Sequence, residues 1–271
     1  MTYSTHSAFH EQMDNEGKRC GMNKKKTMSR QMLAANLAMK RTVDVVGSAV
    51  GLVMLSPLLI GVSIAIKNDS PGPVLFRQER LTRHGKKFEM LKFRSMYVDS
   101  EKKGAGLFNY KNDPRVTKVG RKLRDTSLDE LPQLINVLRG DLSLVGPRPP
   151  VTYELGDFKT LNKTYKKRFR MQAGITGLAQ AEGRNEISWD EKVHYDNQYI
   201  DEFKRKGVLL DAEILFKTFG NVFASKDIYE EKQDESMTAE EAAAAEDAEI
   251  VRIAHLPEDE YREFEREKYG K

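Results

Sequence analysis

The sequence predicts an α/β protein in which a small mixed cytoplasmic domain with amphipathic interfacial helices is attached to a re-entrant membrane helix. Three observations favour this fold class. Residues 45–66 carry no charge, although the chain is polar as a whole, with a mean hydropathy of −0.61. Two segments that alternate between apolar and polar residues follow this run and indicate strands. Later segments place apolar residues at helical spacing.

The composition limits the classes of protein to which this chain can belong. The 271 residues are 39% hydrophobic and 32% charged, enough for one large domain or two small ones with a buried core. A single cysteine, Cys20, excludes an intramolecular disulfide and multi-cysteine metal sites. The net charge of +4 divides unevenly, because residues 230–271 carry 15 acids and 6 bases, a net of −9, which leaves +13 before them. The basic part favours an anionic partner: nucleic acid, an acidic membrane surface or a phosphorylated substrate.

The chain divides into four segments. Residues 1–39 are a polar, basic leader, expected to be loose or weakly helical, with a lysine cluster at 24–26 and no secretory signal. Residues 40–67 are the membrane helix, and residues 68–230 form the mixed domain. Residues 231–271 are rich in alanine and glutamate and predict an exposed acidic tail, helical or disordered.

The apolar run is long enough to cross a membrane. As a helix its 22 residues reach about 33 Å, against about 30 Å for the hydrocarbon core. Ser56 and Pro57 lie at its middle, where proline removes an amide donor and bends a helix. A hydroxyl, from Ser56 or Ser48, is expected to satisfy the carbonyl that this frees.

Charges near the run indicate its topology. Basic residues flank both ends: Lys40, Arg41, Lys67, Arg77, Arg80 and Arg83. The positive-inside rule places both flanks in the cytoplasm, and a bent helix that enters and leaves on one face satisfies both. A straight crossing helix and a buried core helix of a soluble protein are the alternatives.

The first strands are expected in residues 74–81 and 86–96, as a hairpin around His84 and Gly85. Basic residues recur between apolar ones on these segments: Arg77, Arg80, Lys92 and Arg94. They predict either a positive surface for an anion or a solvated face of the sheet.

A helix is expected to begin at a pair of carboxylates and to end at Gly140. Its apolar residues lie at the spacing of one buried face: Leu131, Leu134, Ile135 and Leu138. Ser127 and Glu130 fit a capping box. Residues 189–203 and 209–223 also predict helices, and residues 174–177, GITG, predict a tight turn.

Asp129 and Glu130 are the candidates for chemistry. At a helix start both would be ionised near neutral pH, suited to metal binding or nucleophilic attack, although acids there are ordinarily caps. Basic residues surround the pair in the sequence: Arg121, Lys122, Arg124, Arg139 and Arg148. An acidic pair within a basic rim favours a magnesium and phosphate site. The five histidines have no shared metal-ligand spacing, no serine lies in a nucleophile elbow, and GDLSLVG is not a Walker loop.

Over residues 40–230 the chain resembles the bacterial sugar transferase family of monotopic phosphoglycosyl transferases, which are polyprenyl-phosphate sugar-1-phosphate transferases. The resemblance rests on the broken apolar helix with Ser56 and Pro57 and on five motifs. They are FRQER (76–80), KFRSM (92–96), DPRVTKVG (113–120), LDELPQLINVLRGDLSLVGPRP (128–149) and GITGLAQ (174–180). Ala173 departs from the proline that relatives often carry, the leader lacks the additional membrane helices of larger members, and the acidic tail has no known counterpart.

The resemblance implies an enzyme of the bacterial inner membrane, on its cytoplasmic face. It would transfer a sugar-1-phosphate from a UDP-sugar to undecaprenyl phosphate and release UMP, the first membrane step of exopolysaccharide, capsule, O-antigen or glycoprotein glycan synthesis. The implied cofactor is Mg²⁺, and the implied partners are the donor, the lipid acceptor and membrane lipid, not nucleic acid. A second copy of the chain and downstream glycosyltransferases are further candidate partners.

The resemblance also implies residue roles. Asp129 would attack the β-phosphate and hold the phosphosugar covalently, and Glu130 would ligate magnesium with it or assist the acceptor. Arg124 is the expected phosphate clamp. Four further cations would contact phosphate or serve only as structural ion-pair partners: Lys92, Arg94, Arg115 and Arg148. Two rival functions are a silent membrane-anchored scaffold that binds nucleotide or anionic lipid, and a phosphohydrolase that passes the intermediate to water.

Overall fold

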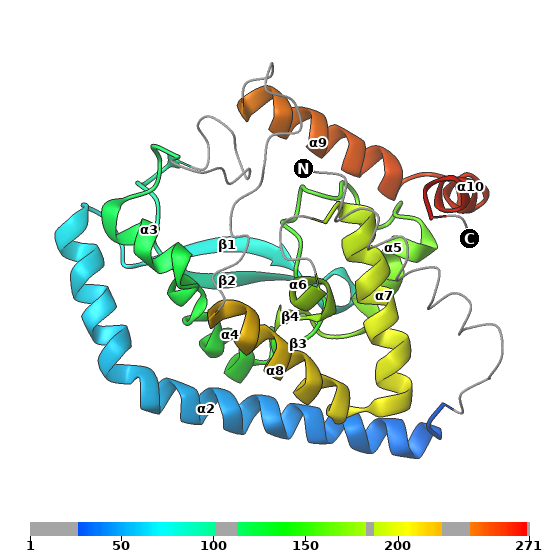
Figure 1. Cartoon of the computed structure of the whole chain (residues 1–271), viewed down its shortest axis with the longest axis horizontal. Helices are drawn as coiled ribbons and strands as arrows, with labels where there is room; N and C mark the ends of the chain where they lie inside the picture. The colour runs from blue at the N-terminus through cyan, green and yellow to red at the C-terminus, as the bar shows by residue number, and fades with distance from the viewer. Residues whose placement is uncertain (1–26, 101–112, 183–186, 224–238, 270–271) are drawn as a thin grey trace.

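In the part of the chain that the structure describes, two small sheets and their surrounding helices form the mixed domain, and one long helix runs along it (Figure 1). The computed structural model describes residues 27–100, 113–182, 187–223 and 239–269. The long helix is α2, Arg30–Asp69. The strands are β1, Leu75–Leu81; β2, Lys87–Phe93; β3, Ser143–Val145; and β4, Gly174–Thr176. The helices and helical turns after α2 are η1, Arg83–Gly85; α3, Lys118–Asp125; η3, Leu128–Glu130; α4, Gln133–Arg139; α5, Lys163–Lys167; η4, Arg168–Arg170; α6, Leu178–Glu182; α7, Trp189–Lys206; α8, Val208–Phe223; α9, Ala239–Ala254; and α10, Glu258–Tyr269.

Helix α2 begins earlier than the sequence suggested. Its N-cap is Ser29, whose hydroxyl accepts a hydrogen bond from the Met32 amide at 3.3 Å, so the last ten residues of the expected leader are helical. These ten residues are rich in methionine, leucine and alanine, which favour helix. Cys20 and the lysine cluster at 24–26 lie outside the described residues.

The long helix changes direction along its length, running along the base of the molecule and then up one side (Figure 1). Pro57 lies inside it and has no amide proton, so the Val53 carbonyl loses its usual donor. The hydroxyl of Ser56 donates to that carbonyl at 2.8 Å. The backbone group freed by proline therefore has a partner from within the helix.

The N-terminal half of α2 is bound to the mixed domain through buried polar contacts. The Lys40 ammonium lies 2.7 Å from a carboxylate oxygen of Asp211 and donates to the Val145 carbonyl at 2.7 Å. A carboxylate oxygen of Asp44 accepts from the Ser143 hydroxyl and the Leu144 amide, at 3.0 and 2.9 Å. Because an unpaired buried charge is costly, these partners fix the depth at which α2 lies against the domain.

The C-terminal end of α2 is bound to the same domain. The Arg94 guanidinium donates to the carbonyls of Ser70 and Pro71, each at 2.6 Å, just beyond the helix. Asp69 accepts from the Val119 amide of α3 at 3.0 Å. Both ends of the apolar run are thus held by one domain.

The predicted hairpin is confirmed. Strands β1 and β2 pair antiparallel, with Phe76 opposite Lys92 and Arg80 opposite Phe88. The connecting turn places His84 at φ 60° and Gly85 at φ 72°, left-handed conformations that glycine adopts without strain. The alternating pattern sends Lys92 to the same face of the sheet as Arg80.

The GITG segment is a short strand and not the predicted tight turn. Residues 174–176 form β4, which pairs parallel with β3. Its glycines allow close approach of two backbones: a Cβ on Gly174 would lie 2.1 Å from the Gly146 amide nitrogen, and one on Gly177 would lie 2.2 Å from the Gly146 carbonyl oxygen. The glycines of this segment predicted a tight turn, but in the structure they allow its backbone to lie close to the backbone of Gly146.

Helix α4 buries a different face from the predicted one. Its fully buried residues are Gln133, Asn136 and Val137, and the Asn136 side chain accepts from the Leu91 amide of β2 at 2.9 Å. The four apolar residues predicted to be buried are only half-buried. One of them, Leu134, lies against α2, where a Cβ on Gly51 would be 3.3 Å from it. The periodicity identified a face that packs on the apolar helix, not one directed into the sheet.

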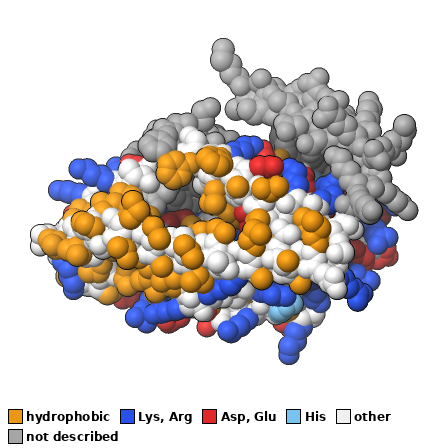
Figure 2. Space-filling model, turned by 90° about the horizontal axis from the view of Figure 1, so that it is seen from below, with side chains coloured by type: hydrophobic (Ala, Val, Ile, Leu, Met, Phe, Trp, Pro, Cys, Tyr) orange, Lys and Arg blue, Asp and Glu red, His pale blue; other side chains and the backbone are white. Residues whose placement is uncertain are grey.

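A broad apolar surface is left exposed on one side of the molecule (Figure 2). On α2, Val53 and Met54 are 74% and 75% exposed, and on α8, Phe216 is 82% exposed. Helix α2 is long and apolar enough to cross a membrane by length and composition. Exposed apolar surface of this extent indicates contact with lipid or with another protein.

Helices 189–203 and 209–223 are confirmed as α7 and α8, and the acidic tail is helical as α9 and α10. The tail is not simply exposed, however. Ile253 of α9 and Tyr261 of α10 are buried in one core with Tyr165 and Val193. The Asn162 amide donates to the Ala254 carbonyl at 2.9 Å. A narrow apolar stripe within an acidic sequence anchors these helices.

Truncation of Tyr261 should destabilise the protein. Its ring is 1% exposed and meets the Tyr165 ring edge to face, with centroids 6.0 Å apart. Tyr261→Ala should lower the free energy of unfolding by about 3 kcal/mol, because the lost ring leaves a cavity. Thermal unfolding in detergent measures this, and Arg262→Ala, on the exposed face of α10, should leave the melting temperature within a degree or so. Equal melting temperatures for the two variants would mean that α10 does not pack as described.

Candidate active site

The two carboxylates lie on a helical turn and not at the start of an α-helix. Asp129 and Glu130 belong to η3, and α4 begins three residues later. The predicted capping box is wrong: Ser127 is left-handed, with φ 56°, and its side chain makes no capping bond. The Glu130 side chain points instead to cations from other elements, because ion pairing within the domain outweighs a local cap.

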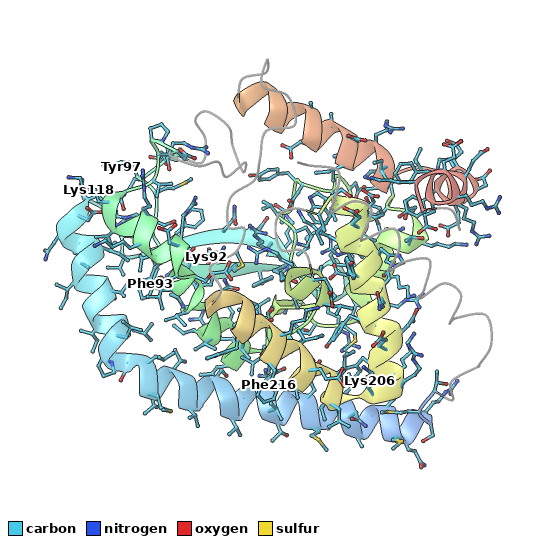
Figure 3. The ribbon with its side chains drawn as sticks, in the orientation of Figure 1. Lys92, Phe93, Tyr97, Lys118, Lys206 and Phe216 are labelled. Carbon is cyan, nitrogen blue, oxygen red and sulfur yellow. The ribbon has the colours of Figure 1, made fainter. Side chains whose placement is uncertain are left out.

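Glu130 is held by two cations. The Lys92 ammonium of β2 lies 2.9 Å from its carboxylate, and an Arg148 guanidinium nitrogen lies 3.2 Å from the same oxygen. Burial disfavours the charged carboxylate, but the charges of Lys92 and Arg148 outweigh burial and hold the pKa of Glu130 well below its usual range. Burial lowers the pKa of Lys92, and Glu130 opposes this. Figure 3 labels Lys92 at its position on β2.

Asp129 has the opposite electrostatic character. It is only 8% exposed, and burial raises its pKa to about 6, against the attraction of Lys92 and Arg124 and with the help of the neighbouring Glu130 charge. The sequence predicted that both carboxylates would be ionised near neutral pH because of a helix start. With a pKa of about 6, Asp129 is still mostly ionised at pH 7, but burial and the neighbouring charge of Glu130, rather than a helix start, set its pKa.

Arg124 reaches the site from α3. Its Nε donates to the Ser95 hydroxyl at 3.0 Å, and its charge acts on Asp129. It also acts on Asp113, which forms a 2.7 Å ion pair with Arg115. Three of the predicted phosphate-binding cations, Lys92, Arg124 and Arg148, thus act electrostatically on Asp129.

The other two predicted phosphate-binding cations have structural partners. Arg115 pairs with Asp113, two residues away. Arg94 is buried and donates to the carbonyls that follow α2. A charged donor at a helix C-terminus satisfies carbonyls that the helix leaves free, which accounts for Arg94. Neither contact brings these side chains to the carboxylate pair.

Two arginines near the site were absent from the predicted site residues. Arg80 donates to the Pro149 carbonyl at 2.6 Å, and its charge acts on Lys92. Arg168 donates to the Arg148 carbonyl at 2.7 Å. The alternation of β1 could have indicated Arg80, since it faces the same way as Lys92. Nothing in the spacing around Arg168 indicated its contact.

The donor set suits a hard divalent cation. Within the described parts of the chain there is no group of three or more histidine, cysteine, aspartate or glutamate side chains that could hold a metal. Asp129 and Glu130 are two neighbouring carboxylates and could supply two ligands, with phosphate and water oxygens as the remaining ligands. Mg²⁺ binds in this way, through one or two carboxylates and substrate phosphates.

Together, the exposed apolar surface, the buried acidic pair and the cations around it are the features expected of a membrane-associated protein that binds a phosphate group. The model of one family, bacterial sugar transferase, matches residues 35–225. The chain belongs to the bacterial sugar transferase family.

Curated relatives agree with this membership. UDP-glucose:undecaprenyl-phosphate glucose-1-phosphate transferase of Escherichia coli strain K12 is 43% identical over 199 residues, 72% of this chain and 42% of that protein. Undecaprenyl-phosphate galactose phosphotransferase of Salmonella typhimurium is 42% identical, over 66% of this chain and 39% of that protein. Exopolysaccharide production protein ExoY of Rhizobium meliloti is 36% identical, over 70% of this chain and 88% of that protein. The matches thus span about two fifths of the first two relatives and most of the third.

Proposed function

We propose that the protein transfers a sugar-1-phosphate from a UDP-sugar to undecaprenyl phosphate and releases UMP. The observation that carries this is the contrast within one acidic pair: Glu130 is held ionised by Lys92 and Arg148, whereas Asp129 titrates near pH 6. The names of the Escherichia coli and Salmonella typhimurium relatives specify undecaprenyl phosphate and a glucose or galactose phosphate, which supports this reaction. The name of the Rhizobium meliloti relative favours exopolysaccharide synthesis as the pathway.

The proposed reaction has two half-reactions at Asp129. In the first, a carboxylate oxygen bonds to the β-phosphorus while the bond from that phosphorus to the bridging oxygen breaks, and UMP leaves with that oxygen and its electron pair. Asp129 then holds the sugar phosphate as an acyl phosphate. In the second, an oxygen of undecaprenyl phosphate attacks the same phosphorus, and the carboxylate is released unchanged.

The residues around Asp129 would stabilise the phosphate charge during the proposed transfer. Arg124 and Arg148 supply fixed positive charge for the phosphate oxygens, and their pre-set positions avoid reorganisation during transfer. Glu130 remains ionised, so it serves as an anchor for Lys92 and Arg148 and not as a proton donor. Mg²⁺, bound by Asp129 and Glu130, would neutralise phosphate charge and orient the donor.

We also propose that α2 is re-entrant and that the domain lies on the cytoplasmic face of the inner membrane. Lys40 near one end of the apolar run and Arg94 beyond the other are both bonded within the same domain. A straight crossing would place one of these contacts on the wrong side of the bilayer. The bend at Pro57 allows both ends to return to one face.

Cysteine labelling tests this topology. In a Cys20→Ser background, single cysteines at Met32 and at Val98, which are 56% and 51% exposed, report on the two flanks. Both cysteines should react with an impermeant maleimide that is added outside inverted vesicles, because the outer surface of these vesicles is the cytoplasmic face of the membrane. Labelling from opposite sides would establish a crossing helix.

The reaction is tested by UMP release from purified protein. UDP-glucose or UDP-galactose with Mg²⁺ and undecaprenyl phosphate should yield UMP, and omission of the lipid should prevent turnover. A scaffold would bind nucleotide without UMP release, and a phosphohydrolase would release UMP continuously without lipid. Mass spectrometry of protein incubated with donor alone should find the added sugar phosphate on the peptide that contains Asp129, and its absence would overturn the covalent step.

The rate should depend on pH through Asp129. Burial raises the pKa of Asp129 to about 6 in the protein without bound metal, and the attacking form is the carboxylate, so kcat/KM, which reports the free enzyme, should fall about tenfold from its plateau to pH 5. The pKa of Glu130 is too low for it to titrate in this range. Initial rates between pH 5 and 8, with circular dichroism at each pH to confirm folding, measure this. A flat profile down to pH 5 would contradict the assignment of Asp129.

A further inference from the structure

The segment that carries Arg148 is unusual in its backbone chemistry. Residues 146–150 read GPRPP, and prolines have no amide proton, so this segment is positioned mainly through its carbonyls. Pro147 accepts from the Gly174 amide at 2.9 Å, and Pro150 from the Leu81 amide at 3.0 Å. Two backbone donors thus fix the outer carbonyls.

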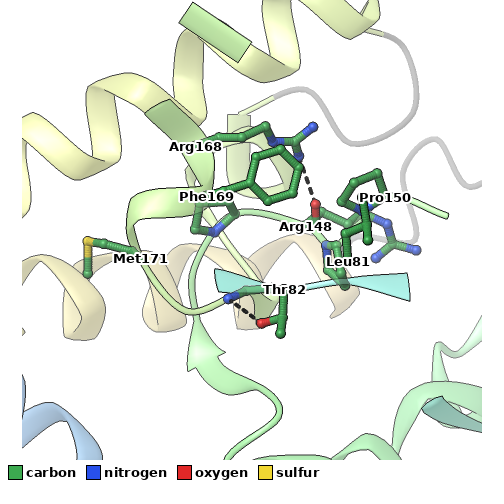
Figure 4. Close-up of a pocket in the computed structure, with 10 residues that line it drawn as sticks. Leu81, Thr82, Arg148, Pro150, Arg168, Phe169 and Met171 are labelled. Atoms are coloured by element: carbon green, nitrogen blue, oxygen red, sulfur yellow. Dashed lines mark hydrogen bonds between the residues drawn. The ribbon is translucent and has the colours of Figure 1, made fainter. Parts of the chain in front are cut away.

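The two inner carbonyls are held by arginine side chains. The Arg148 carbonyl accepts from Arg168 Nη2 at 2.7 Å, and the Pro149 carbonyl accepts from Arg80 Nη1 at 2.6 Å. Figure 4 shows Arg168 directed at the Arg148 carbonyl across a small pocket, with the Arg148 guanidinium pointing away from it. The backbone of Arg148 is therefore held on one side while its side chain extends toward Glu130.

Arg168 is itself rigidly placed. It is 2% exposed, its Nη2 lies 2.7 Å from a carboxylate oxygen of Asp196 in α7, and its guanidinium carbon lies 4.7 Å from the centre of the Trp189 ring. Stacking and a buried counter-ion limit its rotamers. Among the described residues its Nε and Nη1 have no hydrogen-bond partner, so the contacts of the guanidinium with them are concentrated on Nη2, which faces the Arg148 carbonyl.

We infer that Arg168 is a positioning residue that holds the Arg148 backbone so that the Arg148 guanidinium meets Glu130 and the donor phosphate. The inference rests on the proposed function, because it assigns Arg148 to phosphate. Arg168 itself touches no reacting atom. A buried ion pair is weak evidence for stability alone, and here one member of the pair is bonded to the backbone of an active-site residue.

The test is a double-mutant cycle on kcat/KM for lipid-dependent UMP release. Arg168→Lys keeps the charge but loses the stacked planar fork, and it should lower kcat/KM about 10- to 100-fold, since small displacements of positioned groups have effects of this size. In an Arg148→Ala background the same change should alter kcat/KM less than about twofold. Equal losses in both backgrounds, or no loss in either, would overturn the inference.

A matched control separates positioning from loss of stability. Val193→Ala removes volume from the buried core beside Tyr165 without touching Arg148, and should lower the melting temperature while changing kcat/KM less than about twofold. If Arg168→Lys fails to fold, Trp189→Leu removes the ring on which the guanidinium stacks, and should reproduce the same cycle with a smaller loss. An additive loss for Trp189→Leu would overturn the inference equally.

A second readout is independent of catalysis. Between Pro147 and Pro150 the only exchangeable backbone amide is that of Arg148, so hydrogen exchange of a peptide across this segment reports on it. Arg168→Lys should accelerate this exchange, and Val193→Ala should not. If the wild type releases no UMP, the proposed function fails, whereas unchanged exchange in Arg168→Lys overturns the positioning role.

Discussion

Asp129→Asn should abolish lipid-dependent UMP release, with kcat lowered by about 10⁴-fold or more. The amide has almost the same shape as the carboxylate but cannot attack phosphorus, so the variant removes the nucleophile and leaves the packing in place. A burst assay with radiolabelled UDP-sugar measures both the steady rate and the covalent adduct, and neither should be detected. Turnover within tenfold of the wild type would exclude Asp129 as nucleophile.

The same variant should not be less stable than the wild type. The folded pKa of Asp129 is raised from 3.8 to about 6, so its proton stabilises the fold below pH 3.8, and this contribution is lost as the pH rises through 6. At neutral pH the buried charge is therefore a cost, which asparagine removes. An unchanged or higher melting temperature would show that lost activity reflects chemistry. Asp201→Asn, on the exposed face of α7, is the matched control for rate.

Lys92→Met should lower kcat/KM by about 10²-fold or more. The variant leaves Glu130 with one cation fewer and removes a charge that lowers the pKa of Asp129. The methionine fills similar volume, so packing on β2 is retained. The acid limb of the pH–rate profile should also move above pH 6, because the carboxylate of Asp129 loses a stabilising neighbour.

Lys87→Met is the control for this variant. Lys87 lies on the same strand, but it is exposed and pairs with Glu79 at 2.9 Å at the surface. Its replacement should change kcat/KM less than about twofold and leave the pH profile in place. Identical profiles for Lys92→Met and the wild type would mean that the Lys92–Glu130 pair does not set the electrostatics of the site.

The sequence could predict those features that depend on local pattern. The hairpin followed from alternation around His84 and Gly85. The hydroxyl of Ser56 next to Pro57 could be matched to a freed carbonyl, because both lie within one turn of helix. Each of these depends on neighbours only a few residues apart.

Features that depend on distant contacts could not be predicted in this way. The capping box failed because Lys92, 38 residues earlier in the sequence, competes for Glu130. Arg94 looked like a phosphate ligand, yet the end of α2 takes its donors. The Lys92–Glu130 contact and the contact of Arg94 with the end of α2 each join residues far apart in the sequence, so no periodic pattern in the sequence indicates them. The expectation that the acidic tail is exposed failed for a related reason. Its acidic composition outweighed the signal of a few apolar residues, including Tyr261, that pack on a core formed by earlier parts of the chain.

The attachment of both ends of α2 to one domain has a consequence for the lipid. A free helix adapts to a thicker or thinner bilayer by tilting. Here Lys40 and Arg94 fix the two ends, so in the proposed re-entrant arrangement the depth that the bend reaches in the hydrocarbon would be set by the protein. In that arrangement the surrounding lipid would deform to match the protein, and the acyl-chain length of the phospholipid would influence the rate of the proposed reaction.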